Sequence, residues 1–355
     1  MTKLKKLVSK PLFLPIFCMI LVMAVNIIYD VANGNFALNF FTISVRNGIL
    51  YGRLIDVLNR GSEIAILAIG MTLVVSCSAG TDISVGSVMS LAASFCCMLL
   101  AGFGVSSTSH YNVPLFVGVM AGILLAGVCG AFNGALVSFL NVQPMVATLI
   151  LYSAARAIGL LFCNNLIVYV RVDSFGIFGG NIGIIPTPII IAAACILIAT
   201  ILLKKTALGL YIESVGINGK AARLVGLNST MIKFLTYVIC GVLAGIAGIV
   251  ASSRIYSADA NNIGLNLEMD AILAVALGGN FLGGGKFSLI GSVIGAYTIQ
   301  ALTTTLYAMN VKADQLPVYK AIVVVIIVTL QSDVFKKYIA GLKAKKSVAV
   351  EGGQK

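Results

Sequence analysis

The sequence has few charged residues and almost none of the residues that most often carry catalysis. Only 10% of its 355 residues are charged, it contains no tryptophan, and His110 is its single histidine. Soluble proteins carry about 25% charged residues, so this chain lacks the charge to cover a water-facing surface. With 59% hydrophobic residues and a mean hydropathy of +1.04, it is predicted to be a membrane protein.

The sequence also lacks the residue sets that enzymes and metal sites need. Its eight cysteines form no C-x-x-C pair and lie within or at the ends of apolar blocks, so neither a zinc site nor a disulfide framework is indicated. Paired carboxylates and nucleophile–base pairs are missing from these blocks. We therefore expect a non-catalytic protein that uses no metal and no cofactor.

The apolar residues form blocks long enough to cross a bilayer, which takes about 20 residues of helix. They predict an all-α bundle of about ten transmembrane helices. The candidate crossings lie near 12–29, 62–79, 83–101, 114–136, 144–163, 184–203, 234–253, 269–281, 287–308 and 318–331. The eighth and tenth blocks are short, so each is open to being broken or re-entrant. Charged residues interrupt 36–60, for which an interfacial helix is one interpretation.

The net charge of +12 gathers at the flanks of apolar blocks. With the N-terminus in the cytoplasm, ten crossings place sixteen Lys and Arg residues in cytoplasmic segments and six outside, as the positive-inside rule expects. We predict cytoplasmic termini at 1–11 and 336–355, and a membrane domain at 12–335 that includes a cytoplasmic loop at 204–233. No basic stripe interleaved with aromatics indicates nucleic-acid binding.

The first apolar block has two interpretations. Lysines precede it, as in a cleaved signal peptide. The apolar run reaches Ile28, however, and no clear A-x-A cleavage site follows. We favour a retained helix.

The stretch from Gly80 to Ser87 places an acid beside a membrane block. A charge at mid-depth costs about 2.5–3.5 kcal/mol or more, so Asp82 needs a reason to be there. With Ser84 it is able to cap the following helix and satisfy N–H groups at the helix start. A gating or partner-contact role for Asp82, Ser84 and Gly86 is the alternative.

The segment from Ile212 to Gly226 is the longest internal loop and mixes charges with small residues. Ala221, Ala222 and the pair 224–225 are spaced to line one face of a short helix that ends near Gly226. A solvated loop that only supplies positive charge is the alternative, but such a loop does not need an Ala-Ala step between glycines. We favour a docking helix.

The stretch from Gly278 to Lys286 invites comparison with a phosphate-binding loop. The pattern G-x-x-x-x-G-K-[ST] needs glycine where Asn280 stands and Ser or Thr where Phe287 stands, so it fails twice. We predict instead a tight glycine turn between a short helix and the next crossing, with structural or gating roles for Gly279 and Gly284.

Small residues recur through the predicted helices. Gly241, Gly245 and Gly248 are spaced to let helix backbones approach closely, which indicates packing rather than a ligand site. Polar residues at membrane depth are better candidates for a translocation pathway. The pathway candidates are Asn133, Thr148, Arg156 and Gln300.

Three of these motifs, in this order, resemble the ribose/galactoside-type permeases of ABC importers. The stretches 70–74 and 80–86 are similar to the signature GMTLV…GIDLSVG, and 220–226 is similar to the loop on which the cytoplasmic ATPase docks. The third motif, 269–285, resembles the LDAIAAVVLGG…GG block and contains Asp270. The resemblance runs from about residue 60 to 335.

The resemblance is particular to the galactofuranose branch of that family. It rests on 205–209, 213–218, 258–262 and 264–265. Two different permease chains pair in that branch, which implies a heterodimer here, with a homodimer as the alternative. The family also implies an ATPase subunit, an extracytoplasmic sugar-binding protein and a place in the bacterial inner membrane.

The resemblance carries the ATPase-coupling role onto particular residues of the internal loop. These are Glu213, Lys220, Ala221, Ala222, Arg223 and Gly226. Two positions depart from the family pattern, because Lys220 stands where glutamate is usual and Thr81 stands where the family has an apolar residue.

We therefore expect the permease subunit of an ATP-driven importer for a monosaccharide such as galactofuranose, with ATP hydrolysed by a partner chain. A stand-alone secondary transporter or channel for a small polar solute is the alternative. That class is expected to show inverted repeats and intramembrane ionisable residues, whereas Arg156 is the one charge well inside a predicted crossing.

Overall fold

A computed structural model describes residues 12–32, 40–46 and 48–331, so the predicted cytoplasmic termini at 1–11 and 336–355 lie outside the described residues. The helices are α2 (Phe13–Ala32), α3 (Arg53–Ser78), α4 (Val85–Ala101), α5 (Leu115–Ser138), α6 (Pro144–Phe162), α7 (Thr187–Lys205), α8 (Leu208–Leu224), α9 (Ser229–Ile255), α10 (Leu267–Leu277), α11 (Leu289–Ala308) and α12 (Leu316–Gln331). The short 3-10 helices are η1 (Asp173–Ile177) and η2 (Ala313–Gln315). The strands are β1 (Ser44–Arg46), β2 (Ile49–Tyr51), β3 (Ser107–Thr108), β4 (Val168–Val170), β5 (Asn181–Ile182), β6 (Ile185–Pro186) and β7 (Ser257–Ala258).

Within the described residues, seven helices are long and apolar enough to cross a membrane, namely α2, α3, α5, α6, α7, α9 and α11. The predominantly helical membrane fold is thereby confirmed. α10 has 11 residues, which is about 16 Å of helix and too short to cross alone, as its short apolar block predicted. The number of ten crossings and the sidedness of the termini stay predictions.

The interfacial helix suggested for 36–60 is wrong over the residues that the structure describes. β1 and β2 form an antiparallel hairpin there, in which Val45 pairs with Leu50, and α3 begins at Arg53. One of the charged residues that made this stretch ambiguous has a partner in the fold, because Arg53 Nη1 lies 3.1 Å from Oδ1 of the buried Asp30. A paired charge can therefore begin a long apolar helix.

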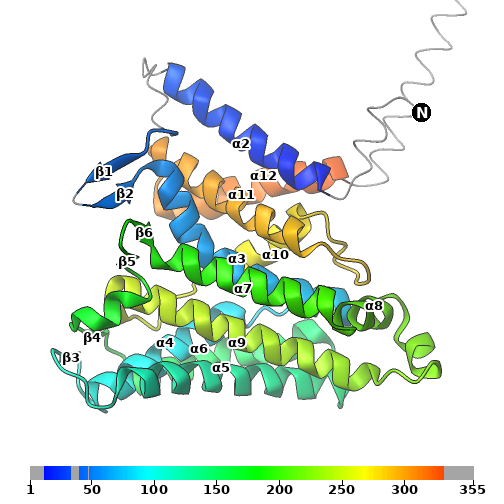
Figure 1. The fold of residues 1–355 in the computed structure, drawn as a ribbon. Helices are drawn as coiled ribbons and strands as arrows, with labels where there is room; N and C mark the ends of the chain where they lie inside the picture. The colour runs from blue at the N-terminus through cyan, green and yellow to red at the C-terminus, as the bar shows by residue number, and fades with distance from the viewer. Residues whose placement is uncertain (1–11, 33–39, 47, 332–355) are drawn as a thin grey trace, which may run out of the picture. The chain divides into compact units, whose positions relative to one another are not determined.

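The chain divides into two compact units, residues 1–304 and 305–355. In the first unit α9 is central and packs against α3, α4 and α5. Figure 1 shows most of the short strands gathered at one end of these helices and α8 at the other. β3, β4 and β7 form one sheet, in which Val168 pairs with Ala258. We call these two ends of the helices the strand end and the α8 end.

Glycines allow α9 to lie close to its neighbours, as their spacing predicted. A Cβ atom on Gly241 would collide with the carbonyl oxygen of Ala126 and lie 2.9 Å from the backbone of Gly130 in α5. A Cβ atom on Gly248 would collide with the carbonyl oxygen of Met89 in α4. Helices in lipid associate through such close packing, because the apolar medium supplies no hydrophobic drive between them.

We predict that Gly241→Ala lowers the stability of the protein by about 1–3 kcal/mol, because the added methyl group separates α5 from α9. The matched control is Gly127→Ala in α5, where the nearest atom to a new Cβ is a flexible Val242 methyl at 3.2 Å. All eight cysteines are buried free thiols, so thermal unfolding can be followed with a thiol-reactive fluorogenic dye. Equal melting temperatures for the two variants would contradict the close-packing account.

Candidate coupling site

α8 consists of two helical pieces joined at Asn218. This residue has non-helical dihedral angles, φ −157° and ψ 95°. Its side-chain Oδ1 accepts hydrogen bonds from the N–H groups of Lys220 (3.1 Å) and Ala221 (3.0 Å), which is how an asparagine caps a helix start. A short helix therefore lies where one was predicted, as a capped piece of six residues or fewer that follows a longer one, and its docking role stays a prediction.

The second piece of α8 ends as a Schellman motif around Gly226. The N–H of Gly226 donates to the Arg223 carbonyl and the N–H of Leu227 to the Ala222 carbonyl, both at 3.0 Å. Gly226 has φ +86°, a conformation that glycine adopts without steric cost. The turn leaves Leu224 and Val225 exposed by 90% and 76%, so a structured apolar tip projects from the α8 end.

The residues predicted to couple to an ATPase divide between the tip and the body of the protein. Lys220 and Ala221 are exposed, whereas Ala222 is buried, so Ala221, Ala222 and the pair 224–225 do not share one face as the spacing suggested. Arg223 donates from Nε to Ser229 Oγ at 2.5 Å and from Nη2 to Thr230 Oγ1 at 3.0 Å. Arg223 therefore anchors α8 to the start of α9, and Glu213 lies half-buried in the first piece.

The first piece of α8 lies on the end of α3. Its Ile212 and Val215 are buried in one cluster with Leu73 and Cys77 of α3. Burying a side chain of this size contributes about 1.5–3 kcal/mol, which holds α8 against the bundle. Packed side chains therefore attach α8 to the end of α3.

Gly216 brings α8 into backbone contact with two other segments. A Cβ atom there would collide with the Ser76 carbonyl of α3 and lie 2.7 Å from the Gly285 nitrogen. The N–H of Gly285 donates to the same Ser76 carbonyl at 2.9 Å. The end of α3, the first piece of α8 and the glycine turn at 278–286 thus meet at one point.

The glycine turn is fixed to α11 by the residue that excluded a phosphate loop. Asn280 Nδ2 donates to Ser292 Oγ at 2.6 Å, and its Oδ1 accepts from the Ser288 N–H at 2.6 Å. Ser292 Oγ in turn accepts from Thr72 Oγ1 of α3 at 2.7 Å. Positive φ angles at Gly279 (+79°) and Gly284 (+89°) form the turn itself, which supports their predicted structural role.

The Asp82 motif follows directly after the end of α3. Asp82 is buried, and its Oδ1 accepts from the Ser84 N–H (2.9 Å) and the Ser84 hydroxyl (2.6 Å). α4 begins with Ser84 as its N-cap residue, so Asp82 satisfies the N–H before the helix rather than those inside its first turn. The predicted capping of α4 is therefore wrong in its detail, because Ser84 makes no side-chain cap hydrogen bond and Asp82 binds the N-cap residue itself.

Two pathway candidates are engaged with the Asp82 motif. Asn133 of α5 donates from Nδ2 to Ser84 Oγ at 2.9 Å, and Thr148 of α6 accepts from the Ile83 N–H at 3.2 Å. Both side chains are fully buried. Gln300 is buried too and donates to Thr304 Oγ1 at 3.4 Å. In the described part of the chain, these three side chains thus make hydrogen bonds within the fold. A transport role for them stays a prediction.

Arg156, the fourth pathway candidate, binds backbone rather than an acid. Its Nη1 donates to the carbonyls of Ala260 and Asn261, each at 2.7 Å. These carbonyls belong to an irregular segment, 259–266, that enters the bundle between β7 and α10. The sequence pattern did not predict this segment, because its residues are too few and too polar for a crossing.

Gly86 and two acids complete this region. A Cβ atom on Gly86 would collide with the Glu268 carboxylate and the Gly264 carbonyl, so glycine is needed where α4 meets the start of α10. Glu268 and Asp270 are both buried in the first turn of α10. Glu268 was not predicted, because it precedes the apolar block by one residue. Its position did carry a signal, since acidic residues are favoured in the first turn of a helix.

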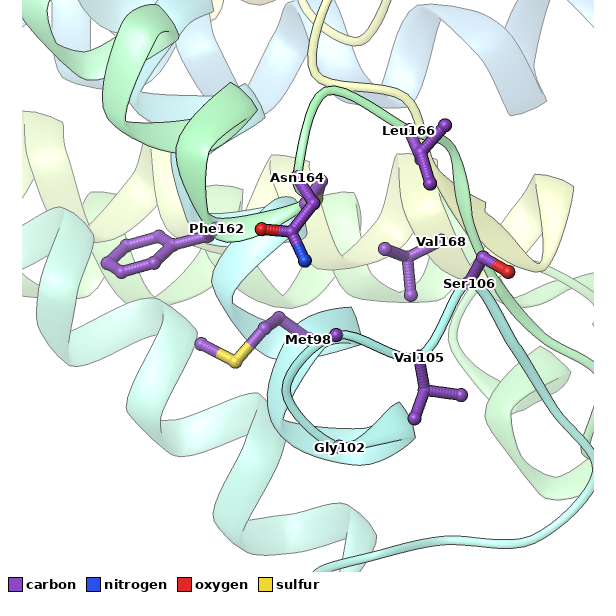
Figure 2. A pocket seen from close by; sticks show the side chains of 10 residues that line it. Met98, Gly102, Val105, Ser106, Phe162, Asn164, Leu166 and Val168 are labelled. Carbon is purple, nitrogen blue, oxygen red and sulfur yellow. The ribbon is translucent and has the colours of Figure 1, made fainter.

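A small pocket lies at the strand end of the bundle, between the ends of α4 and α6 (Figure 2). Met98, Asn164 and Val168 are among its lining residues. Its volume is about 10 Å³, about enough for one water molecule. This pocket is too small for a monosaccharide.

Comparisons with known proteins identify the family of this chain of long apolar helices. Residues 53–330 match the family described as "Branched-chain amino acid transport system / permease component". The chain belongs to this permease family. The match spans α3 through nearly all of α12, so it includes the coupling site and the Asp82 motif.

Three permeases illustrate the relatives of the chain. The galactofuranose transporter permease of Escherichia coli (strain K12) is 42% identical over 86% of this chain and 87% of its own length. The fructose import permease FruF of Bifidobacterium longum (strain NCC 2705) is 34% identical over 98% and 95%. The ribose import permease of Escherichia coli (strain K12) is 36% identical over 83% and 87%.

We predict that Gly216→Ala disturbs the junction of α8, α3 and the glycine turn, at a cost of about 1–3 kcal/mol. Gly219→Ala is the matched control in the same helix, because the nearest atom to its new Cβ is a Val215 methyl at 4.0 Å. Thermal unfolding with the thiol dye checks both. If the two variants are equally stable, the contact between α8, α3 and the glycine turn does not depend on a glycine at position 216.

Proposed function

We propose that this chain is the membrane-spanning permease subunit of an ATP-driven importer and that its cargo is a monosaccharide, with galactofuranose as the first candidate. Family membership supports the permease role, and the three relatives named above carry sugars according to their names. ATP hydrolysis belongs to a partner chain in this proposal. The protein resides in the bacterial inner membrane with the α8 end in the cytoplasm.

The observation that carries the proposal is the exposed apolar tip of α8. Leu224 and Val225 are held in an unfavourable, water-exposed position by a capped helix and a Schellman turn. Structured apolar side chains with neighbouring cations, here the exposed Lys220, are typical of a protein-binding surface. In an importer of this kind the partner at the cytoplasmic face is the ATPase.

The attachment of the tip explains how ATPase movement would reach the bundle. α8 contacts the end of α3 and the glycine turn through Gly216, and the end of α3 leads directly into the Asp82 motif. A push on the tip thus moves α3 and α11 together rather than bending a free loop. A secondary transporter does not need such a tip, and this favours the importer over that alternative.

The proposal includes two further partners. A second permease chain completes the pore, either a different chain or a second copy of this one, and an extracytoplasmic binding protein delivers the sugar to the strand end. Co-expression of the chain with candidate ATPase, permease and binding-protein chains, followed by purification through a tag on this chain, tests the assembly. A chain that retains no ATPase under conditions that keep it folded would overturn the proposal.

We predict that Leu224→Asp abolishes co-purification of the ATPase and sugar uptake in proteoliposomes, while the isolated permease keeps its melting temperature. A charge at a site that is 90% exposed costs little in the free protein but is costly in an apolar interface. Phe103→Asp is the control for ATPase association, because Phe103 is 74% exposed in the loop after α4 at the strand end. Normal ATPase retention by Leu224→Asp would contradict the docking role.

A substitution at Gly226 would test a different property from a substitution in the apolar tip. Its φ of +86° means that any larger residue strains the Schellman turn, so a Gly226 variant reports on the shape of the tip rather than on a direct contact. The charge replacement at Leu224 is therefore the sharper test.

A further inference from the structure

The segment 259–266 descends from the strand end into the interior of the bundle. It follows β7, whose Ala258 pairs with Val168. Ser90 Oγ of α4 donates to the Ala260 carbonyl at 2.8 Å, and further along, the Gly264 carbonyl lies against Gly86. Ser90 and Gly86 are eleven and fifteen residues before the strand end of α4, which is roughly 17 and 23 Å along a helix.

Counted from the strand end of α4, this descent carries an irregular backbone roughly 17–23 Å along a hydrocarbon core of about 30 Å. Water is absent at that depth, so the protein must satisfy the peptide groups itself. Arg156 donates to the carbonyls of Ala260 and Asn261. Asp259 Oδ1 accepts from the N–H groups of Asn261 (3.0 Å) and Asn262 (3.3 Å).

Several backbone groups of the segment thus have partners, but three of its side chains are exposed. Asn261, Asn262 and Asn266 are all exposed. Burying an uncompensated amide in an apolar medium costs at least about 1–3 kcal/mol, so we do not expect the exposed amides of Asn261 and Asn266 to face acyl chains. Irregular backbone at this depth occurs where it is covered by protein or lines a water-filled cavity.

The chemistry of these side chains selects the ligand. A primary amide offers two donors and an acceptor, which matches a sugar hydroxyl that both donates and accepts. Asn262 uses its Nδ2 to donate to Asp259 Oδ2 at 2.6 Å and so belongs to the turn. No side-chain cap hydrogen bond is made by Asn266, and neither Asn261 nor Asn266 carries a charge that would attract an ion.

We propose that Asn261 and Asn266 line the sugar pathway midway through the membrane and hydrogen-bond the hydroxyl groups of the passing monosaccharide. This inference rests on the proposed function as a sugar importer. Arg156 is a positioning residue in this account, because it holds the segment through backbone carbonyls without reaching the sugar. A second permease chain that covers the two asparagines is the competing explanation of their exposure.

The test uses the assembled transporter, with its partner permease, ATPase and binding protein, in proteoliposomes that take up radiolabelled galactofuranose, ribose or fructose. Asn261→Ala removes one amide, and Asn266→Gly removes the other without straining its φ of +62°. The control is Asn181→Ala, an exposed asparagine in β5 at the strand end. Each pathway variant is expected to change the uptake rate of the transported sugar about three- to tenfold, the size of one lost hydrogen bond.

A second measurement separates a pathway from an interface. Asn261→Cys introduces a thiol into a chain whose own eight cysteines are buried. In the assembled transporter a membrane-impermeant methanethiosulfonate is expected to modify this thiol, as detected on this chain by mass spectrometry, and the transported sugar is expected to slow the modification.

The outcomes are distinct. Changed uptake with intact assembly, together with sugar-protected labelling of Asn261→Cys, supports the inference. Unchanged uptake in both variants, or a thiol that is unreactive in the complex, overturns it, as does loss of the partner permease from the variants, since the asparagines would then form an interface. A wild-type chain that retains no ATPase overturns the proposed function and this inference with it, whereas normal wild-type transport with unchanged variants overturns this inference alone.

Discussion

Backbone N–H and C=O groups buried among packed helices have no water to bind, and two breaks between elements in the described part of the chain must meet this constraint. The first interruption lies between α3 and α4 and the second between β7 and α10. In each, side chains take the place of water: Asp82 and Thr148 accept N–H groups in the first, and Asp259 and Arg156 satisfy the second. The charges of Asp82, Asp259 and Arg156 are explained by this requirement before any transport role is invoked.

The same requirement accounts for the glycines that line these interruptions. A loop that returns into a bundle must lie directly against a neighbouring helix, because any gap would leave polar groups without partners. Gly86 allows α4 to touch both Gly264 and the Glu268 carboxylate, and Gly216 allows α8 to touch Ser76. These glycines are defined by contact between backbones, in contrast to Gly226, which is defined by its left-handed conformation.

Apolar block length was sufficient to predict the helices but not the segments that enter the bundle without crossing it. The helical fold, the short α10 and the helix ending near Gly226 follow from hydropathy and glycine spacing. The start of α3 was not predicted, because a charged residue such as Arg53 normally ends an apolar block. Its partner Asp30, which neutralises it, lies more than twenty residues earlier in the sequence. Long-range partners of this kind cannot be read from local pattern.

The candidate site was predictable in its parts and not in its assembly. Lys220, Gly226 and the Gly278–Lys286 turn were each singled out, yet nothing in the sequence indicated that α8 and the turn meet at Ser76. The inward position of Ala222 was also missed, because adjacent residues of a helix point about 100° apart, so Ala221 and Ala222 cannot share one narrow face. Asn261 and Asn266 carry no signal by themselves, because their significance comes from depth and exposure together.

The shortness of α10 connects the two sites. One end of this helix leads into the glycine turn, where Gly278 approaches the backbone of Gly291 and Ser292 in α11. The other end, at Glu268, lies against Gly86 below the asparagine-bearing segment. An 11-residue helix is a stiff rod of about 16 Å, and it reaches from the α8 end only to mid-membrane. In the proposed importer, a movement imposed on α8 therefore reaches the proposed sugar-lining segment through one rigid helix. A helix that crossed the whole membrane would instead carry the movement past this segment to the opposite face.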